Sequence, residues 1–336
     1  MRASRFLVAL VCLLLLATPA HAQVSIRGQV RNGTRDGPSV APGTSVTFVG
    51  LRNNSIVSTS DLATDASGGF TVPAFKPEAD MTYVASVEYL GVPYYSNLLI
   101  GDELTAESAF TVTVFETTPL SSTITLDPAH VIIEVSERAL RVQELFFVQN
   151  AGDRTYVGQA DPRLNSQVTT LHFSLPLDAT ELSIGGGDDL TQIIRTGDGF
   201  FDTSPIPPGS HEYQFSYALS YTGATHTVSK TFFYPTAQFI VLVTDVGTSV
   251  TSPQLTSQGT RSMGATDYLL LSAREPLSPG SQVQINLANL PQTLAVQGTA
   301  PADAYLRWLA LGAGVLALLA SLGFAFSRSR GFEATR

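Results

Sequence analysis

The chain is nearly free of cysteine. Its 336 residues include a single cysteine, Cys12, which lies inside an apolar run close to the N-terminus. Removal of that run would leave a mature chain without disulfides, thiolate metal sites or a cysteine nucleophile. The fold must then be held together by packed apolar cores, and about 280 residues are enough for two domains of ordinary size.

Basic residues are also scarce. Residues 23–303 carry 13 Lys and Arg against 27 Asp and Glu, which gives a net charge of −14 with histidine neutral. Such a surface repels a polyanionic backbone, and no basic stripe with interleaved aromatic residues interrupts it. We therefore expect no nucleic-acid partner.

Helix signals are few outside two apolar segments. The chain has 27 Gly and 19 Pro, and only 14% of its residues are charged. Most of the remaining sequence consists of short runs in which apolar and polar residues alternate with the period of two that is typical of half-buried strands. The composition and the alternation predict a mainly β protein.

The first apolar segment has the features of a secretory signal peptide. Arg2 and Arg5 form a basic start, residues 6–16 form an apolar core, and the segment Ala20-His21-Ala22 has the small-x-small pattern of a cleavage site. We expect residues 1–22 to be removed, with an uncleaved N-terminal anchor as the alternative.

The second apolar segment predicts one membrane span. Residues 308–326 contain no charge, and as a helix they would cover about 28 Å, close to the thickness of a bilayer core. We place the span at 305–326, after a juxtamembrane linker at 291–304. The arginine-rich tail, residues 327–336, should lie in the cytoplasm by the positive-inside rule. The prediction is a single-pass protein of a bacterial cytoplasmic membrane, with a periplasmic or extracellular ectodomain.

Small side chains recur every four residues along this predicted span. They would form one stripe on the helix: Ala313, Ala317, Ser321 and Ala325. In lipid, small residues let helices approach closely, so the stripe is a candidate surface for helix packing. The alternative is a chance register in an alanine-rich anchor.

The first predicted domain covers residues 23–118. Its landmarks are Gly28-x-Val30, Pro42-Gly43-x-x-Val46, Thr64-Asp65-x-x-Gly68-Gly69-Phe70 and Tyr83-x-x-x-Val87. This order of features resembles the carboxypeptidase regulatory-like domain, and the resemblance implies a transthyretin-like β-sandwich without catalytic residues. The sequence departs from the family pattern at residues 76–81, which replace a Pro-Gly turn.

A second domain is predicted at residues 129–290, after a Ser-, Thr- and Pro-rich linker at 119–128. Its clearest signal is the run from Tyr213 to Tyr221, in which aromatic and polar residues alternate, and residues 228–234 are expected to return as the hairpin partner of that run. Residues 239–243 are apolar at every position, which indicates a central strand covered on both faces. We predict a second β-sandwich, immunoglobulin-like in architecture.

No pattern in the chain establishes a metal or cofactor site. An acidic, glycine-rich stretch contains Asp188, Asp189, Asp198 and Asp202, but its spacing matches no calcium loop, and a solvated acidic turn explains it better. The histidines of the mature chain are His130, His172, His211 and His226. Because none of them has a metal-ligand spacing, we interpret them as core or surface residues, and we expect no cofactor.

The best binding candidates are two adjacent tyrosines, Tyr94 and Tyr95, which follow a turn at residues 91–93. Tyrosine offers flat amphipathic surface to a sugar or to a protein partner. Adjacent residues on a strand point to opposite faces, so at least one of the pair should be buried. No Gly-x-Ser-x-Gly elbow is present to indicate a serine hydrolase.

These observations favour a non-catalytic, membrane-anchored envelope protein. Its β-sandwich domains would present a surface for protein–protein interaction or scaffolding, with another envelope or membrane protein as partner, for example as an accessory subunit of a membrane complex. The alternatives are a carbohydrate-binding cell-surface protein and an envelope hydrolase.

Overall fold

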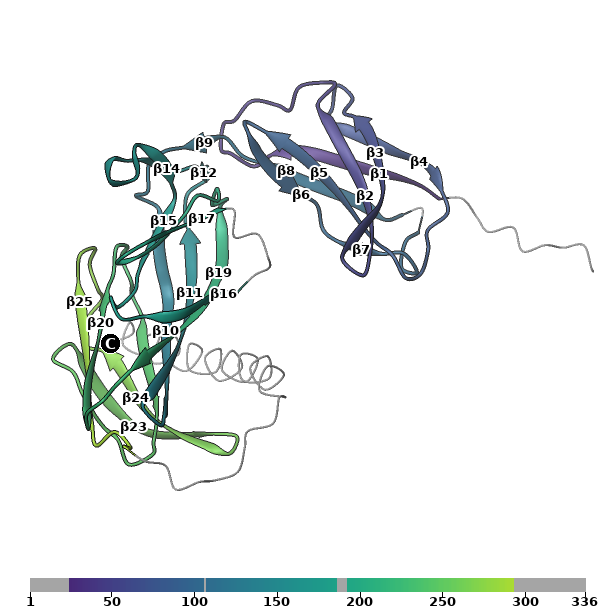
Figure 1. The fold of residues 1–336 in the computed structure, drawn as a ribbon. Helices are drawn as coiled ribbons and strands as arrows, with labels where there is room; N and C mark the ends of the chain where they lie inside the picture. The colour runs from purple at the N-terminus through teal and green to yellow at the C-terminus, as the bar shows by residue number, and fades with distance from the viewer. Residues whose placement is uncertain (1–23, 106, 186–191, 293–336) are drawn as a thin grey trace, which may run out of the picture. The chain divides into compact units, whose positions relative to one another are not determined.

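The computed structural model describes residues 24–105, 107–185 and 192–292, and in these ranges the protein is mainly β, as predicted (Figure 1). The one helix whose bounds both lie within them is a short 3-10 turn, η1 (Pro162–Leu164), and no helix of these residues is long and apolar enough to cross a membrane. The predicted signal peptide, membrane span, small-residue stripe and tail all lie outside the described residues.

The chain divides into two compact units that are not simple consecutive segments. The N-terminal unit combines the chain up to Thr123 with Asn150–Thr170 and Thr203–Gly209, and the C-terminal unit contains the rest. This division differs from the boundaries expected from the sequence, because two later segments belong with the first unit. The expected linker at 119–128 also ends early, since β10 begins at Ile124.

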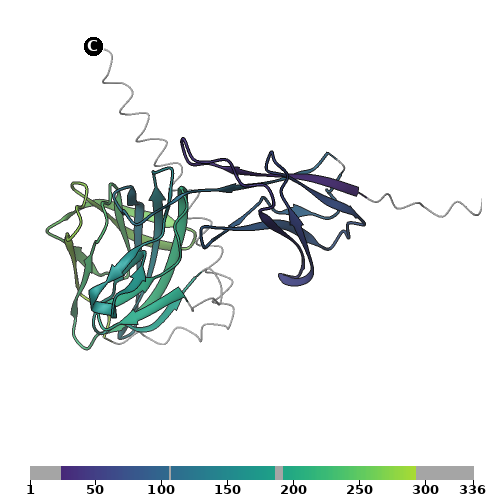
Figure 2. The ribbon, with the colours of Figure 1, turned by 90° about the horizontal axis from the view of Figure 1, so that it is seen from above.

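The main part of the N-terminal unit consists of two sheets. The smaller has the order β4-β1-β8, and the larger has the order β3-β2-β5-β6 with β7 paired to β5 (Figure 1 and Figure 2). The strand bounds are β1 (Val24–Asn32), β2 (Ser45–Arg52), β3 (Ser55–Ala63), β4 (Gly69–Phe75), β5 (Thr82–Tyr89), β6 (Val92–Tyr95), β7 (Leu99–Ile100) and β8 (Ala109–Val114). β1 pairs antiparallel with β4 and parallel with β8.

Strand alternation explains the core of this unit. On β2, Val46 and Phe48 are buried and their neighbours are not. The two sheets share one apolar cluster that includes Ile26, Phe70 and Phe110. The tight turn that the sequence indicates at Asn53 and Asn54 is present between β2 and β3, and both asparagines have positive φ, 50° and 61°, as asparagine tolerates better than most residues.

The later segments of the N-terminal unit form two small ladders. β9 (Thr117–Thr118) pairs parallel with β12 (Thr155–Tyr156), and β13 (Gln159–Asp161) pairs antiparallel with β14 (Gln167–Thr169). The turn between β13 and β14 contains η1.

The C-terminal unit is built on a seven-stranded sheet of order β16-β19-β11-β10-β21-β24-β23. The strand bounds are β10 (Ile124–Ser136), β11 (Ala139–Asn150), β16 (Thr180–Ile184), β19 (Gly209–Ser220), β21 (Phe239–Thr244), β23 (Leu255–Met263) and β24 (Thr266–Ala273). The all-apolar run at 239–243 forms the interior strand β21, which confirms its predicted central place. β21 pairs parallel with β10, whereas an immunoglobulin sandwich has two antiparallel sheets; the unit departs from the expected architecture in this respect.

Two three-stranded sheets complete the C-terminal unit, with orders β15-β18-β17 and β20-β25-β22. The strand bounds are β15 (Leu171–Ser174), β17 (Ile193–Thr196), β18 (Gly199–Asp202), β20 (Thr225–Thr231), β22 (Ser249–Thr251) and β25 (Gln282–Ala288). Phenylalanine rings join the first of these sheets to the large one: Phe146 stacks on Phe173 at 5.5 Å between ring centroids, and Phe200 meets Phe215 edge-on at 4.9 Å.

The prediction that residues 213–221 and 228–234 form a hairpin is wrong. β19 lies between β16 and β11, and β20 pairs instead with β25. The N–H of Tyr221 donates to the carbonyl of Arg138, next to β11, whereas the carbonyl of Ala224 accepts from the N–H of Leu290, which follows β25, so the two ends of the turn at 222–224 are bonded to different sheets. Tyr221 is thereby anchored away from β20, so the two strands enter different sheets.

Candidate functional site

One face of the larger sheet in the N-terminal unit is apolar and turned away from the core. The strand register places Ile56 opposite Leu51, Leu51 opposite Thr82, and Thr82 opposite Ile100, so these side chains form one row across the sheet. The next rows contain Val49 opposite Val84, and Ser86 opposite Tyr95. We call the apolar members the apolar sheet face: Val49, Leu51, Ile56, Val84, Tyr95 and Ile100, of which Val84 is buried by its neighbours, at 7% exposure.

Three members of this face are strongly exposed. The exposed fraction is 66% for Ile56, 64% for Tyr95 and 46% for Ile100, and the adjacent Leu98 is 63% exposed. The one acidic group in these rows, Asp61, lies on the edge strand β3 opposite Thr47, whose hydroxyl donates to it over 3.3 Å. An apolar, nearly uncharged face on a strongly acidic chain is the kind of surface that marks a protein-binding site.

The structure separates the two candidate tyrosines, as alternation along a strand requires. Tyr94 is 4% exposed, and its hydroxyl contacts Thr155 Oγ1 at 2.7 Å and donates to the carbonyl of Phe115 at 3.1 Å. Burial raises the pKa of the Tyr94 phenol. Tyr94 therefore anchors the segment 150–170 to the first sandwich, and only Tyr95 is available to a partner.

These placements predict different effects of removing each phenol hydroxyl. Tyr94→Phe should lower the free energy of unfolding by about 1 to 2 kcal/mol, because Thr155 and the Phe115 carbonyl lose a buried partner. Tyr95→Phe, the matched control on the exposed face, should change it by less than about 0.5 kcal/mol. Chemical denaturation of the full chain in detergent measures both. Equal effects would mean that the buried contact contributes nothing.

A buried charged network in the C-terminal unit was not predicted from the sequence. Lys230 Nζ lies 2.5 Å from Glu144 Oε2, and the Tyr217 hydroxyl donates to Glu144 Oε1 over 2.8 Å. Lys230 also donates to the carbonyl of Ser174 over 2.8 Å. Burial raises the pKa of Glu144 and lowers that of Lys230, while the attraction within the pair opposes both shifts.

This network joins strands of three sheets. Glu144 is on β11 and Tyr217 on β19, both in the large sheet, whereas Lys230 is on β20 and Ser174 on β15. The Lys230 ammonium also lies 5.2 Å from the ring centroid of Phe146. Because Glu144 and Lys230 are fully enclosed, with side chains 0% and 4% exposed, the network can fix the packing of the sheets but cannot reach a ligand.

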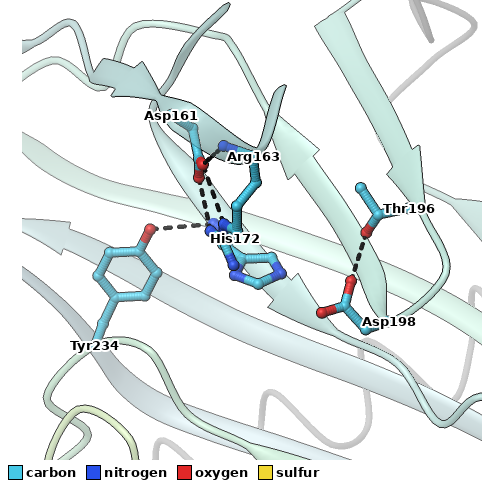
Figure 3. A network of polar contacts seen from close by, with 6 residues as sticks. All are labelled: Asp161, Arg163, His172, Thr196, Asp198 and Tyr234. Carbon is cyan, nitrogen blue, oxygen red and sulfur yellow. Dashed lines mark hydrogen bonds and ion pairs between the residues drawn. The ribbon is translucent and has the colours of Figure 1, made fainter. Parts of the chain in front are cut away.

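The acidic residues considered as an ion site do not converge. Asp188 and Asp189 lie outside the described residues. Asp198 precedes β18 and Asp202 ends it, so about 13 Å of extended chain separates them. Asp198 accepts from the Thr196 hydroxyl at 2.8 Å (Figure 3), and Asp202 accepts from the Tyr213 hydroxyl at 2.7 Å. Among the described residues no group of three or more His, Cys, Asp or Glu could hold a metal.

Two of the four histidines of the mature chain, His130 and His172, are buried in the fold. The His172 ring is stacked between Phe201 and Phe233, at 4.0 and 3.9 Å between ring centroids, and its backbone N–H donates to the Tyr234 hydroxyl at 3.1 Å (Figure 3). His130 on β10 is 1% exposed, and burial lowers its pKa to about 4. His211 and His226 are half-buried on β19 and β20. Figure 3 also shows the ion pair of Asp161 with Arg163, which stabilises the turn at η1.

Comparisons with known proteins identify no family for this chain. No protein-family model and no curated protein matches it. Among solved structures, an M1 zinc metallopeptidase from Deinococcus radiodurans is similar over 49% of this chain and 42% of its own, with 10% identity and a TM-score of 0.31. Legionella pneumophila aminopeptidase A is similar over 51% of this chain and 22% of its own, with 12% identity and a TM-score of 0.30. The chain thus spans less than half the length of either structure.

Proposed function

We propose that this protein is a non-catalytic, single-pass envelope protein that binds a partner protein through the apolar sheet face. The observation that supports the proposal is the exposure of Ile56, Tyr95 and Ile100 on one face of a five-stranded sheet. Exposed aromatic and aliphatic side chains at the centre of a patch supply most of the energy of typical protein interfaces.

The charge of the chain supports a protein partner with a matching apolar surface. The stretch 23–303 carries a net charge of −14, yet the rows of the apolar sheet face contain no lysine or arginine and only Asp61 at their edge. Glu88, exposed on the same face of β5 opposite Pro93, must then stay at the solvated rim of the interface, because burying an unpaired charge would cost several kcal/mol per ion.

The proposal includes the membrane topology and the module type. The span at 305–326 anchors the protein with the tail 327–336 in the cytoplasm and both units on the other side. The N-terminal sandwich is a carboxypeptidase regulatory-like module, consistent with its two sheets and with Gly28, where a Cβ would lie 1.9 Å from the Phe70 ring.

Site-specific photo-crosslinking in intact membranes tests the binding face. A benzophenone amino acid at Tyr95 or Ile100 should give one adduct of the same mass, because both positions lie on the same face. A probe at Leu177, which is 86% exposed in the C-terminal unit, serves as the control and should not give that adduct. No adduct from Tyr95 and Ile100, or the same adduct from all three positions, would contradict the proposal.

The affinity of the interaction should depend on the same residues. The double substitution Tyr95→Ser and Ile100→Ser should weaken recovery of the crosslinked partner at least about tenfold, since loss of two exposed apolar contacts costs more than about 1.4 kcal/mol. The matched pair Leu177→Ser and Val246→Ser removes exposed apolar side chains from the other unit and should leave recovery unchanged.

A further inference from the structure

The outer face of the smaller sheet in the N-terminal unit contains a polar hollow. It measures about 390 Å³ and lies over β4, β1 and β8, which pair in that order in the smaller sheet. This volume is at the lower end of the range of pockets that hold small ligands. The hollow belongs to the opposite sheet from the apolar sheet face and is independent of it.

Strand register explains why the surface is hollowed here. Arg27 on β1 lies between Thr71 on β4 and Ala109 on β8, and Gln29 lies between Gly69 and Thr111. Each long side chain of the central strand is therefore flanked by short ones. The side chains of Arg27 and Gln29 therefore project from the sheet, and the shorter side chains beside them leave open space.

The guanidinium of Arg27 is available to a ligand. Arg27 is exposed and has no hydrogen bond or ion pair with any residue in the described ranges. The next residue on the same face after Gln29 is Arg31, whose Nε donates to the Thr113 hydroxyl at 3.1 Å. Two arginines on one strand face are unusual in a stretch with 13 basic and 27 acidic residues. The unpaired guanidinium N–H groups of Arg27 can donate two parallel hydrogen bonds to a carboxylate or a phosphate.

An open acceptor lies at the other end of the hollow. Asp65 Oδ1 accepts from the N–H and hydroxyl of Ser67 at 2.8 and 2.7 Å and from the N–H of Gly69 at 2.9 Å. These bonds lower the pKa of Asp65 and keep it ionised. Oδ2 accepts no hydrogen bond from the described residues. A Cβ at Gly69 would lie 2.8 Å from Oδ2, so the carboxylate occupies the space above that glycine.

We infer that this hollow binds an acidic saccharide, with a carboxylate of the sugar on Arg27 and sugar hydroxyls on Asp65, Thr71, Thr111 and the amide oxygen of Gln29, whose amide nitrogen already donates to the carbonyl of Ser67 at 2.7 Å. A simple inorganic anion would satisfy Arg27 but leave the other groups unused. A ligand with many hydroxyls and one acidic group uses the free donor, the free acceptor and the short hydroxyl side chains between them.

Titration calorimetry of the full chain in detergent micelles with an aldotetraouronic acid, a tetrasaccharide that carries one carboxylate, tests this site. We expect saturable binding that weakens with added salt. Arg27→Gln should weaken it at least tenfold, and Thr111→Val, which removes a hydroxyl at constant shape, severalfold. Arg261→Gln is the matched control, because it removes the same charge from the exposed strand β23 of the other unit, and it should bind like the unchanged protein.

Two further ligands test whether the site requires both an acidic group and sugar hydroxyls. Cellotetraose, a neutral saccharide of the same length, should bind at least tenfold more weakly, and inorganic phosphate should not compete at equal concentration. Absence of saturable binding, equal loss in Arg27→Gln and Arg261→Gln, or tight binding of either competing ligand would overturn the inference. Equal melting temperatures of the variants establish that the losses are not caused by misfolding.

Discussion

Lys230→Met should lower the free energy of unfolding by about 3 to 5 kcal/mol, the cost of leaving a buried charge without its partner. The substitution keeps the length of the side chain but removes the ammonium that lies 2.5 Å from Glu144. Glu144 then retains only the Tyr217 hydroxyl as a hydrogen-bonding partner and must either stay charged in an apolar core or take up a proton. Chemical denaturation of the full chain in detergent at neutral pH measures the loss.

Two comparisons separate the charge effect from general sensitivity to substitution. Lys76→Met changes the other lysine of the mature chain, which is exposed, and should alter stability by less than about 0.5 kcal/mol. The double variant Glu144→Gln with Lys230→Met should be more stable than Lys230→Met alone, because the remaining buried charge is gone. Similar losses for the two lysine variants, or a double variant whose loss equals the sum of the two single losses, would contradict a stabilising role of the buried charged network.

The stability of the protein should also fall by up to about 3 kcal/mol between pH 6.5 and pH 4 through His130 alone. Burial lowers the pKa of His130 from 6.5 to about 4 in the folded protein. The unfolded chain therefore binds a proton at His130 before the folded one does. The contribution of His130 is complete above pH 6.5 and is lost as the pH falls toward 4.

His130→Leu should remove this part of the pH dependence, since leucine has no proton to bind. Denaturation curves at pH 7, 5.5 and 4 give the slope for each protein, and the difference from the unchanged chain isolates His130 from the carboxylates. His226→Leu, at a half-buried position on β20, is the control and should leave the slope as it was. If His130→Leu does not reduce the change of unfolding free energy with pH, His130 is not the source of this pH dependence.

The sequence predicts local features of the fold well. The aromatic alternation from Tyr213 to Tyr221 gives a strand in which Phe215, Tyr217 and Leu219 are buried. The continuous apolar run at 239–243 gives an interior strand. These predictions succeed because side-chain period and burial are set by the strand itself, whichever strand lies beside it.

Pairing between distant strands is not contained in local patterns. Residues 213–221 and 228–234 are close in sequence and both alternate, yet β20 pairs with β25, which begins at Gln282. The tyrosine candidates illustrate the same limit. Alternation predicts that one of Tyr94 and Tyr95 is buried, but the Thr155 partner of Tyr94 lies 61 residues away and has no local signal.

The sequence contains a signal for the buried ion pair. Glu144 is in phase with the buried residues Val142 and Phe146, and Lys230 is in phase with Val228 and Phe232. A charge in the buried phase of a strand must find a partner of opposite sign, because an isolated charge in a core is too costly. Two such residues of opposite charge in one unit are therefore candidates for a pair.

The chain passes between the two units after residues 123, 149, 170, 202 and 209. The N-terminal unit is consequently incomplete until the chain has been synthesised as far as residue 209 and segment 150–170 has packed against β9 and Tyr94. A chain cut after Thr123 would keep both sheets of the first sandwich but lose the Thr155 contact at the Tyr94 hydroxyl. Segments of the two units therefore alternate along the chain. A single cut cannot release either unit whole and free of residues of the other.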